Sequence, residues 1–375
     1  MATNKDTQSI SAFLELVRAG LWDTEVQLAQ YREVNLNNIF DMASEQSVVG
    51  LVAAGLEHVT DIKVSKEELL QFIGQAIHIE QRNIAMNAFV ATLIERLRNA
   101  DIYSILLKGQ GIAQCFDKPL WRACGDVDLL LDEVNYEKAK LFLLPLASEC
   151  DVEEKYGKHI GLTIDGWSIE LHGTQHCELS WRTDRVIDKT QEAVFVGGNV
   201  RTWMNGNTIV YLPAPNEDVF FVFTHFIKHF FKEGVGLRQI CDWCRLLYVY
   251  RESIDNKLLE TRLKKSRLMT EWKVFAAFAV DKLGMPEYAM PFYSSKARWG
   301  RKAEQVMAFV MEVGNFGHNK DMSYFRKYPY LIRKAISFYR RSGSLIHHAG
   351  IFPFDSIRFV PGFIFNGLRS AANGE

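Results

Sequence analysis

The sequence predicts an α+β fold, with a small mixed β-sheet core flanked by N-terminal and C-terminal helical regions. Helical periodicity fills residues 1–100. Strand-like runs and helices then mix over residues 101–212 without regular βαβ repetition, which favours α+β over a doubly wound sheet. Amphipathic helical patterns return over residues 213–375. We therefore expect three regions with these boundaries, the last one ending in a basic, aromatic tail.

Composition excludes several classes of protein. The 375 residues are 48% hydrophobic and 24% charged, which is ordinary for a soluble globular chain. A net charge of −1 gives the molecule no overall bias toward nucleic acid or anionic membrane. The first residues lack a basic stretch followed by an apolar one, and no apolar run reaches the roughly 18–20 residues of a spanning helix. We expect a cytoplasmic protein without a transmembrane segment.

The N-terminal region opens with "SISAFLELVRAGLW", whose apolar residues recur at helical spacing. A capping box formed by Ser65 and Glu68 predicts the start of a second helical stretch. Apolar residues then recur at three- and four-residue intervals to about residue 102. This stretch is long enough to be either one helix or two.

The middle region changes period. A short buried strand ending in glycines is predicted for "YSILLKGQG", followed by a helix start in "GIAQCFD" and a buried strand in "DVDLLLD". A helix should follow in "NYEKAKLFLLPLA" and end near Pro145. Paired strands are predicted for "HIGLTID" and "WSIELHG" around the turn "DGW", and one more strand for "NTIVYLP".

The C-terminal region is predicted to begin with the amphipathic helices "NEDVFFVFTHFIKHFF" and "QICDWCRLLYVYRESI". Cys241 and Cys244 form a C-x-x-C in the second of these. Because no second cysteine pair or zinc-finger histidine pair accompanies it, buried reduced thiols are favoured over a zinc or redox site.

Residues 319–369 differ from the rest of the chain in charge. They carry two acids, Asp321 and Asp355, against nine bases, a balance of +7 among many aromatic residues. The bases are Lys320, Arg326, Lys327, Arg333, Lys334, Arg340, Arg341, Arg358 and Arg369. This mixture suits an anionic partner, such as an RNA strand, a phosphate-bearing acceptor or a membrane surface. The alternative is a helical domain whose aromatics form its core and whose bases face solvent.

Two acids mark the candidate site. Asp126 and Asp128 are one residue apart in a predicted strand, so their side chains point to the same face. Adjacent carboxylates stay ionised together only with a cation or strong donors between them, and an oxygen-only pair suits Mg²⁺. Glu170 lies in the middle of another apolar strand and shares a face with His172. The alternative is that Asp126 caps a strand, Asp128 forms an ion pair and Glu170 is exposed.

A glycine-rich turn precedes these acids. Lys108, Gly109, Gln110 and Gly111 lie between a predicted strand and a helix start, where backbone can approach a phosphate. Lys108 and Arg122 would add positive charge for a triphosphate. A plain tight turn is the alternative explanation for the glycines.

The order of these features resembles the DNA-polymerase-β-like nucleotidyltransferase superfamily. The features are a strand, "KG", a helix, Arg122, "GDVDLLL", a hairpin and "IELH". Over about residues 100–250 the chain is more closely similar to uncharacterised nucleotidyltransferase family five, which also has a histidine pair in a helix like "PAPNEDVFFVFTHFIKHF". The resemblance implies that residues 101–212 are the nucleotidyltransferase core.

The resemblance also implies a ligand set. Asp126, Asp128 and Glu170 would be the catalytic metal ligands for two Mg²⁺ ions, with Mn²⁺ as a substitute. Gly109 and Gln110 stand where the superfamily usually has glycine-serine, a serine that often touches the nucleotide phosphate. Lys108 or backbone amides would take over that contact.

Three histidines have open roles. His225 and His229 are four residues apart on a predicted helix, a spacing that allows one metal ion between them. Alternatively, that helix packs beside the sheet with one histidine near the cleft. His172 would orient Glu170 or contact a phosphate. Asp242 is expected to be a helix-surface or domain-packing acid.

The expected function is transfer of a nucleoside monophosphate from a nucleoside triphosphate, such as ATP, to an acceptor hydroxyl with release of pyrophosphate. The acceptor is a small molecule, a protein or RNA. One alternative is an abortive-infection-type toxin that modifies transfer RNA with the same core. The other is a non-catalytic module that binds nucleotide or a membrane surface.

Overall fold

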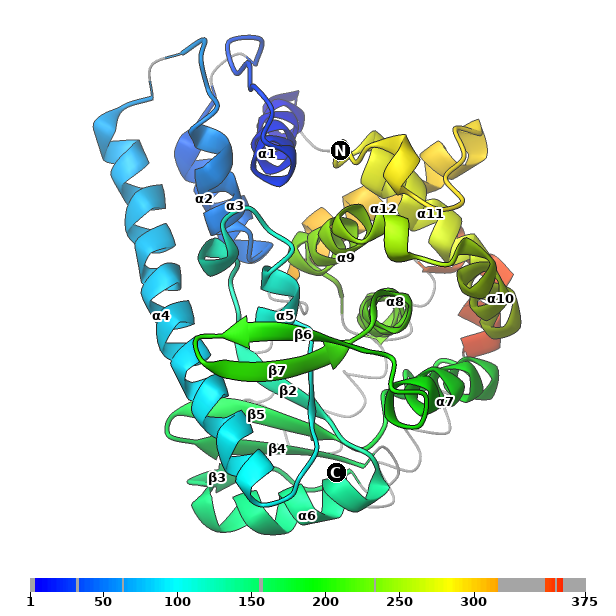
Figure 1. Cartoon of the computed structure of the whole chain (residues 1–375). Coiled ribbons are helices and arrows are strands. Elements are labelled where there is room, and N and C mark those ends of the chain that lie inside the picture. Colours follow the sequence, from blue (N-terminus) through cyan, green and yellow to red (C-terminus); the bar gives the residue numbers. More distant parts are fainter. Residues whose placement is uncertain are drawn as a thin grey trace, which may run out of the picture.

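The computed structural model describes residues 4–31, 34–62, 64–154, 158–232, 234–315, 348–354 and 356–359. The chain begins with the helices α1 (Asn4–Trp22), α2 (Leu36–Glu45), α3 (Val49–Leu56) and α4 (Lys66–Asn99), drawn in blue to cyan in Figure 1. The predicted helix start is confirmed, since Ser65 is the N-cap and its Oγ accepts a bond from Glu68 N. The Glu68 carboxylate accepts from the Ser65 hydroxyl at 2.7 Å, which replaces the backbone contact of a full capping box.

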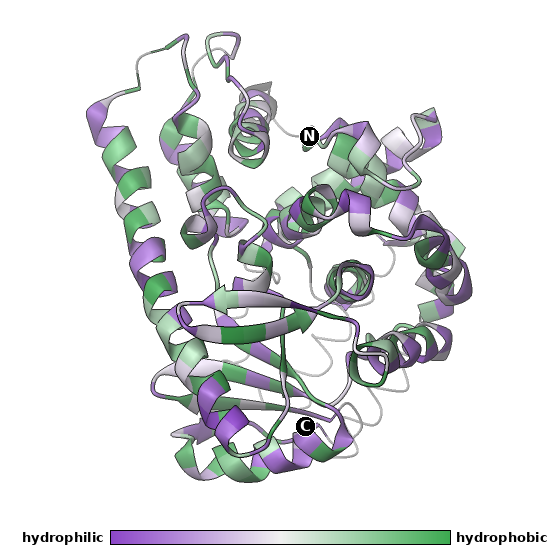
Figure 2. Ribbon diagram, in the orientation of Figure 1, coloured by the Kyte–Doolittle hydropathy of each residue, from purple (hydrophilic) through white to green (hydrophobic). Residues whose placement is uncertain are grey.

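Helix α4 is one continuous helix of 34 residues. One face of the helix is buried through apolar residues such as Phe72, Met86 and Val90, whereas Leu70 and Ile84 are exposed. Hydrophilic and hydrophobic residues alternate along it in Figure 2. Glutamates in the first turn and arginines in the last turn complement the helix dipole. The sequence had left open whether this stretch would be one helix or two.

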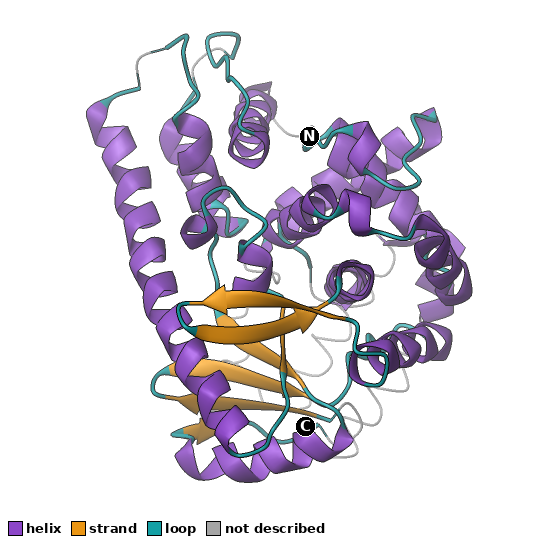
Figure 3. Cartoon of the chain, in the orientation of Figure 1, coloured by secondary structure: helices purple, strands orange, loops and turns teal. Residues whose placement is uncertain are grey.

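The next region folds into a five-stranded mixed sheet. Its strands are β1 (Ile105–Leu107), β2 (Asp126–Leu130), β3 (Glu149–Cys150), β4 (His159–Ile164) and β5 (Trp167–His172), in the order β1-β2-β5-β4-β3. Only β2 and β5 are parallel neighbours, and the other pairs are antiparallel. This mixed sheet with helices around it confirms the predicted α+β fold class (Figure 3).

Short helices, 3₁₀ turns and one tight hairpin turn connect these strands. A five-residue helix, α5 (Gly109–Ala113), follows β1, and a 3₁₀ turn, η1 (Pro119–Trp121), precedes β2. Helix α6 (Glu133–Leu143) ends in a second 3₁₀ turn, η2 (Leu144–Leu146), as expected near Pro145. The β4–β5 hairpin turns on Asp165 and Gly166, both with positive φ, which is the requirement of a tight two-residue hairpin.

The two faces of the sheet differ in chemistry. One face is apolar throughout and packs on α4 and α6 through residues such as Leu106, Leu129, Ile169 and Leu171. On the other face only the β1 side is apolar, with residues such as Leu107. Because side chains alternate along strands, the acids of β2 and β5 fall on this second face.

A second, two-stranded sheet consists of β6 (Val200–Asn205) and β7 (Thr208–Pro213). The strand in "NTIVYLP" is thus confirmed, and Val210 and Leu212 join the apolar cluster under the main sheet. Sequence reasoning did not find β6 or helix α7 (Trp181–Phe195). Strand β6 has few buried positions, so its alternation is weak. Helix α7 is largely polar, but its buried residues, such as Thr183, Val186 and Thr190, do recur at helical spacing, a signal that sequence reasoning overlooked.

The C-terminal part is helical, with α8 (Pro215–Lys232), α9 (Leu237–Val249), α10 (Asn256–Ser266), α11 (Met269–Asp281) and α12 (Ala297–Val313). The 3₁₀ turns η3 (Arg251–Ser253) and η4 (Glu287–Ala289) lie between them. Cys241 and Cys244 are buried free thiols, as expected. In the ranges given above, no helix combines the length and apolarity needed to cross a bilayer.

Helices from both ends of the chain enter one hydrophobic cluster. That cluster contains Phe13 of α1 and Phe220 of α8, and it continues to Phe352 and Phe359. The boundaries of the three predicted regions, at residues 100 and 212, remain predictions.

Most of the basic, aromatic segment 319–369 lies outside the described residues. Within its described part, Phe352 and Phe359 pack against Phe231 of α8, whereas Phe354 is exposed. Two of its aromatics therefore contribute to the core. The anionic partner predicted for this segment remains a prediction.

Candidate functional site

Three carboxylates converge on the polar face of the main sheet. Asp126 and Asp128 come from β2, and Glu170 comes from β5, directly opposite Asp128 in the register. Oxygen atoms of the three side chains all lie within 4.8 Å of one another. Asp128 is buried, with 3% of its surface exposed, while Asp126 and Glu170 are half-buried. The parallel pairing of β2 and β5 thus brings together the three acids expected from sequence.

Lys108 supplies positive charge to this cluster. Its Nζ atom lies 2.9 Å from Asp128 Oδ1. Lys108 and Gly109 have φ angles of +48° and +40°, so the chain reverses sharply after β1 and the lysine side chain turns back over β2. A Cβ atom on residue 109 would also come within 3.2 Å of Cys124 Sγ, so glycine suits this position on both grounds.

Two histidines adjoin the acids. His172 Nε2 lies 2.8 Å from Asp128 Oδ1 and 3.3 Å from Glu170 Oε2. His159, at the start of β4, places its Nε2 atom 3.4 Å from the same Glu170 oxygen. His172 therefore contacts two of the acids, which supports its predicted role in orienting Glu170.

The pKa values of the three acids are shifted in different directions by their surroundings. Repulsion by Asp128, and then burial, raise the pKa of Asp126. Burial also pushes the pKa of Asp128 upward, but Lys108 and the His172 hydrogen bond outweigh it, and the net shift is downward. Burial likewise opposes ionisation of Glu170, but the two histidines lower its pKa strongly. At neutral pH the cluster is rich in negative charge. Of the three acids, Asp126 is the one whose pKa is raised, so it is the first to take up a proton as the pH falls.

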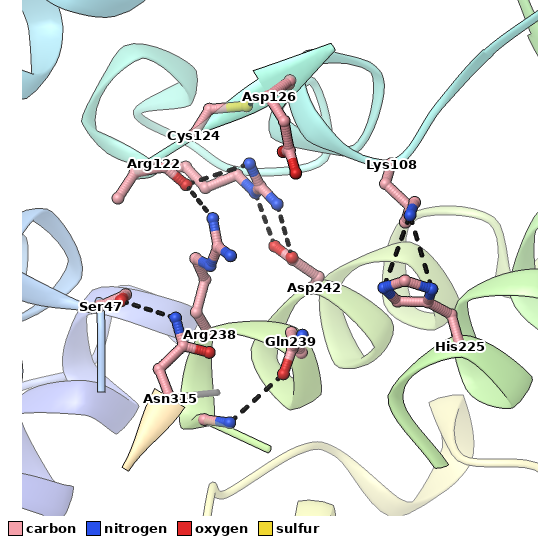
Figure 4. A network of polar contacts seen from close by, with 12 residues as sticks. Ser47, Lys108, Arg122, Cys124, Asp126, His225, Arg238, Gln239, Asp242 and Asn315 are labelled. Carbon is pink, nitrogen blue, oxygen red and sulfur yellow. Dashed lines mark hydrogen bonds and ion pairs between the residues drawn. The ribbon is translucent and has the colours of Figure 1, made fainter. Parts of the chain in front are cut away.

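Arg122 is engaged by a partner outside the cluster. Its Nε and Nη2 atoms donate to the two carboxylate oxygens of Asp242 at 2.8 and 2.7 Å, and both side chains are buried (Figure 4). Asp242 belongs to α9, so this pair joins the loop before β2 to the C-terminal helices and is the domain-packing contact expected of that acid. Burial opposes the charge of Arg122, but Asp242 raises its pKa overall.

A second guanidinium, that of Arg238, lies next to this pair. Its Nη1 atom donates to Ala123 O at 2.7 Å, and its buried Nε atom has no hydrogen-bond partner among the residues that the structure describes. Burial, and then repulsion by Arg122, lower the pKa of Arg238. Figure 4 shows Arg238, Arg122 and Asp242 gathered near Asp126, with Lys108 and His225 beside them. Arg238 is thus a charged group with hydrogen-bonding capacity to spare near the acids.

Gln110 points away from the acids. It is buried, and its Nε2 atom donates to Asn83 Oδ1 of α4 at 2.7 Å. Any contact of Gln110 with a phosphate would have to come from its backbone. Helix α5 has only five residues. The dipole at its N-terminus is therefore that of little more than one helical turn.

His225 stands beside Lys108 rather than in a metal-ligand group. Both of its ring nitrogens lie 3.5 Å from Lys108 Nζ. Burial, and then the charge of Lys108, lower its pKa well below the ordinary value, so it is a neutral imidazole that can accept a hydrogen bond from the lysine. Its ring centroid is 4.5 Å from that of His229. These positions agree with the packing alternative, in which one histidine of α8 lies near the cleft.

A pocket of about 110 Å³ opens behind the Arg122 loop. Residues of α1 and α3 line it together with Trp121, Arg122 and Arg238. The three acids are not part of its lining. The pocket therefore adjoins the candidate site through the two arginines without containing it.

Sequence reasoning missed two residues near the acids, His159 and Arg238. A signal for His159 was present, because a two-residue turn at Asp165 and Gly166 fixes the hairpin register and pairs His159 with His172. Arg238 had no such signal. It is brought to the site by packing of α9, 110 residues beyond the acids of β2 in the sequence.

One comparison with known proteins identifies a family for this chain. The model of a family described as uncharacterised nucleotidyltransferase matches residues 32–280, more than half of the chain. No curated protein and no solved structure gave a significant match. The matched range includes the acids, Lys108, both histidines of the sheet and Arg238. The chain therefore belongs to this uncharacterised family of nucleotidyltransferases.

Proposed function

We propose that the protein is a metal-dependent enzyme that transfers a nucleoside monophosphate from a nucleoside triphosphate to an acceptor hydroxyl, releasing pyrophosphate. The observation that carries this proposal is the convergence of Asp126, Asp128 and Glu170 on one face of the sheet, beside Lys108. In this reaction the acceptor oxygen forms a bond to the α-phosphorus, and the bond to the β-phosphate oxygen breaks. The hydroxyl proton passes to solvent or to a nearby base.

The donor set fits divalent magnesium. Three carboxylates provide hard oxygen ligands from two neighbouring strands, and Mg²⁺ binds such oxygens together with substrate phosphates. Bound there, the metal would supply charge stabilisation for the phosphates and the attacking oxygen. We propose Asp126, Asp128 and Glu170 as its ligands, with two Mg²⁺ ions, or Mn²⁺, as cofactors.

The cationic side chains suit the triphosphate. Lys108 already neutralises Asp128, and we infer that it turns to phosphate once a divalent cation takes over that role. Arg238 replaces Arg122 as the arginine proposed for phosphate contact, because Asp242 holds the Arg122 guanidinium on two sides. Gly109 allows close approach of backbone to the nucleotide. Phosphoryl transfer depends mainly on positioning and charge stabilisation, and these residues supply both.

A non-catalytic binding module is less consistent with this site, because binding alone does not call for three converging acids. The transfer-RNA-modifying toxin remains the alternative enzyme. Its support is the basic tail, most of which lies outside the described residues. The cytoplasmic location stays a prediction.

The experiment that tests the proposal is a label-transfer screen. The purified chain is incubated with each α-³²P-labelled nucleoside triphosphate, Mg²⁺ and cell extract, and the label is followed into protein, RNA and small molecules. We expect divalent-cation-dependent label on one of the three fractions. Nucleotide binding that never leads to transfer, with any of the four nucleotides, would favour the binding module.

Glu170→Gln is expected to lower kcat far more than it weakens nucleotide affinity. Glu170 lies on β5, opposite Asp128 of β2, and we assign it to activation of the acceptor. Loss of an interaction made mainly in the transition state lowers kcat, whereas loss of uniform binding raises KM. Steady-state kinetics and equilibrium binding of a nonhydrolysable nucleotide separate the two effects.

A matched control for this variant is Glu149→Gln, an exposed acid of β3 outside the cluster, which should behave as wild type. If Glu170→Gln abolished binding yet turned over bound nucleotide at the normal rate, the assignment of Glu170 to acceptor activation would be wrong.

Arg238→Gln is expected to weaken binding of a nonhydrolysable nucleoside triphosphate roughly 10- to 100-fold, since a hydrogen bond to a charged group contributes about 1.5–3 kcal/mol. Binding of the monophosphate should change little, because it lacks the β- and γ-phosphates. Isothermal titration with both ligands measures the difference. Arg251→Gln is the control, since Arg251 also donates to a backbone carbonyl but lies at the far end of α9. Equal loss of both ligands in Arg238→Gln would indicate a structural role.

A further inference from the structure

A second group of ligand-type side chains lies beside the three acids. His159 is on β4, and Glu170 and His172 are on β5. His159 pairs with His172 in the antiparallel register, and Glu170 is two residues before His172, so all three side chains share the polar face. Ligand atoms of the three lie within 4.8 Å of one another. Glu170 belongs to both groups, which therefore adjoin each other.

The distances from Glu170 to the two histidines are longer than that of a typical charge-assisted hydrogen bond. The His172 Nε2 to Asp128 Oδ1 distance of 2.8 Å is typical of a charge-assisted hydrogen bond, about 2.7–2.9 Å. The distances from Glu170 Oε2 to His159 Nε2 and His172 Nε2, 3.4 and 3.3 Å, are longer. Bonds of about 2.0–2.1 Å place neighbouring ligands of a tetrahedral ion about 3.4 Å apart. The two distances from the glutamate oxygen thus match the spacing of neighbouring ligands in a metal site, and the ligand atoms of the two histidines lie within 4.8 Å of each other.

We propose that His159, Glu170 and His172 form a second cation site, one that takes a borderline divalent metal such as Zn²⁺ or Co²⁺. Imidazole nitrogens favour these ions, whereas Mg²⁺ prefers oxygen. Two histidines and one glutamate leave a fourth position open for water or substrate, as in catalytic rather than structural zinc sites. The proposal concerns metal binding alone and does not depend on nucleotidyl transfer.

The surrounding contacts allow such an ion. His172 would have to exchange its hydrogen bond with Asp128 for the metal, but Asp128 would keep its ion pair with Lys108. The His159 and Glu170 side chains are each 33% exposed, so an ion can reach them from solvent. Gly161, paired with Glu170 across β4 and β5, has no side chain of its own, and the Asp151 carboxylate lies over it, with Oδ2 at 2.3 Å from the position of a Cβ atom there.

The test is titration of the full, chelator-treated chain with Co²⁺, followed by its visible absorption. We expect the wild type to develop the intense d–d bands of a four- or five-coordinate ion with nitrogen ligands, and Zn²⁺ to displace the Co²⁺. His159→Asn should weaken Co²⁺ binding roughly 100-fold, because one of three protein ligands is lost. The same variant should bind Mg²⁺ as the wild type does, since all three carboxylates remain.

Two controls separate this site from its neighbours. His176→Asn removes a histidine that pairs with Asp188 at 2.6 Å outside the site, and it should leave the Co²⁺ bands intact. Asp126→Asn removes a ligand of the carboxylate site only, so the bands should survive in it as well. Absence of the bands in the wild type would overturn the proposal without reference to any variant. Unchanged bands in a folded His159→Asn variant would overturn it too.

Discussion

Asp126→Asn is expected to abolish nucleotidyl transfer while making the metal-free chain more stable. The carboxylate is a proposed metal ligand, and loss of several kcal/mol of transition-state stabilisation slows a reaction on the order of 10³-fold or more. The gain in stability follows from electrostatics, because repulsion by Asp128 is the largest factor that raises the pKa of Asp126. Asparagine keeps the shape of the side chain and removes that repulsion.

The sign of the pH dependence follows from the direction of this shift. The folded chain holds the Asp126 proton more tightly than the unfolded chain does, so ionised Asp126 destabilises the fold at neutral pH. The stability advantage of Asp126→Asn should therefore be present at neutral pH. It should disappear as the pH falls through the folded pKa of Asp126 to below the ordinary aspartate pKa.

Thermal unfolding at neutral and acidic pH, together with the label-transfer assay, measures both effects in the same variant. Asp128→Asn should also abolish transfer, but it should lower stability, because Lys108 and His172 would both lose a buried partner. Transfer at the wild-type rate in either variant would refute the proposed metal site.

Arg122→Met is expected to destabilise the chain by about 3–5 kcal/mol, because it leaves the Asp242 carboxylate buried without its partner. Asp242→Leu should cost a similar amount by stranding the guanidinium. The double variant Arg122→Met, Asp242→Leu should recover much of the loss, since replacing a buried ion pair by apolar side chains is often close to neutral. Chemical denaturation of the four proteins gives the coupling energy between the two residues.

The same variants decide between two roles for Arg122. If Arg122 only joins the loop before β2 to α9, the double variant will bind a nonhydrolysable triphosphate about as well as the wild type. A large loss of affinity in the stable double variant would instead support the phosphate contact that sequence reasoning assigned to Arg122.

Local patterns predicted most of the fold. The helix cap at Ser65, the turn at Asp165 and Gly166, and the period-two alternation around Asp126 each act within a few residues, and each is found in the structure. The polar strand β6 was missed because its burial depends on its neighbours rather than on its own composition.

The same distinction between local patterns and long-range packing applies to the residues of the candidate site. Asp126, Asp128 and Glu170 could be predicted, because strand alternation and the resemblance to a known family pointed to them. The engagement of Arg122 by Asp242, and the approach of Arg238, could not, because both depend on how α9 packs against a loop more than 100 residues earlier in the chain.

The pairing of β2 with β5 also has a consequence for folding errors. These strands are parallel and lie about 40 residues apart in sequence, so their contact forms only after a long loop closes. A slip of one residue would place Ile169 or Leu171 opposite Asp128 and turn Glu170 toward the apolar layer on α4 and α6. Such a slip would bury a carboxylate and expose aliphatic side chains. Misaligned chains would therefore lose both the cluster of three acids and the core, so the forces that stabilise the core also favour the register in which the three acids meet.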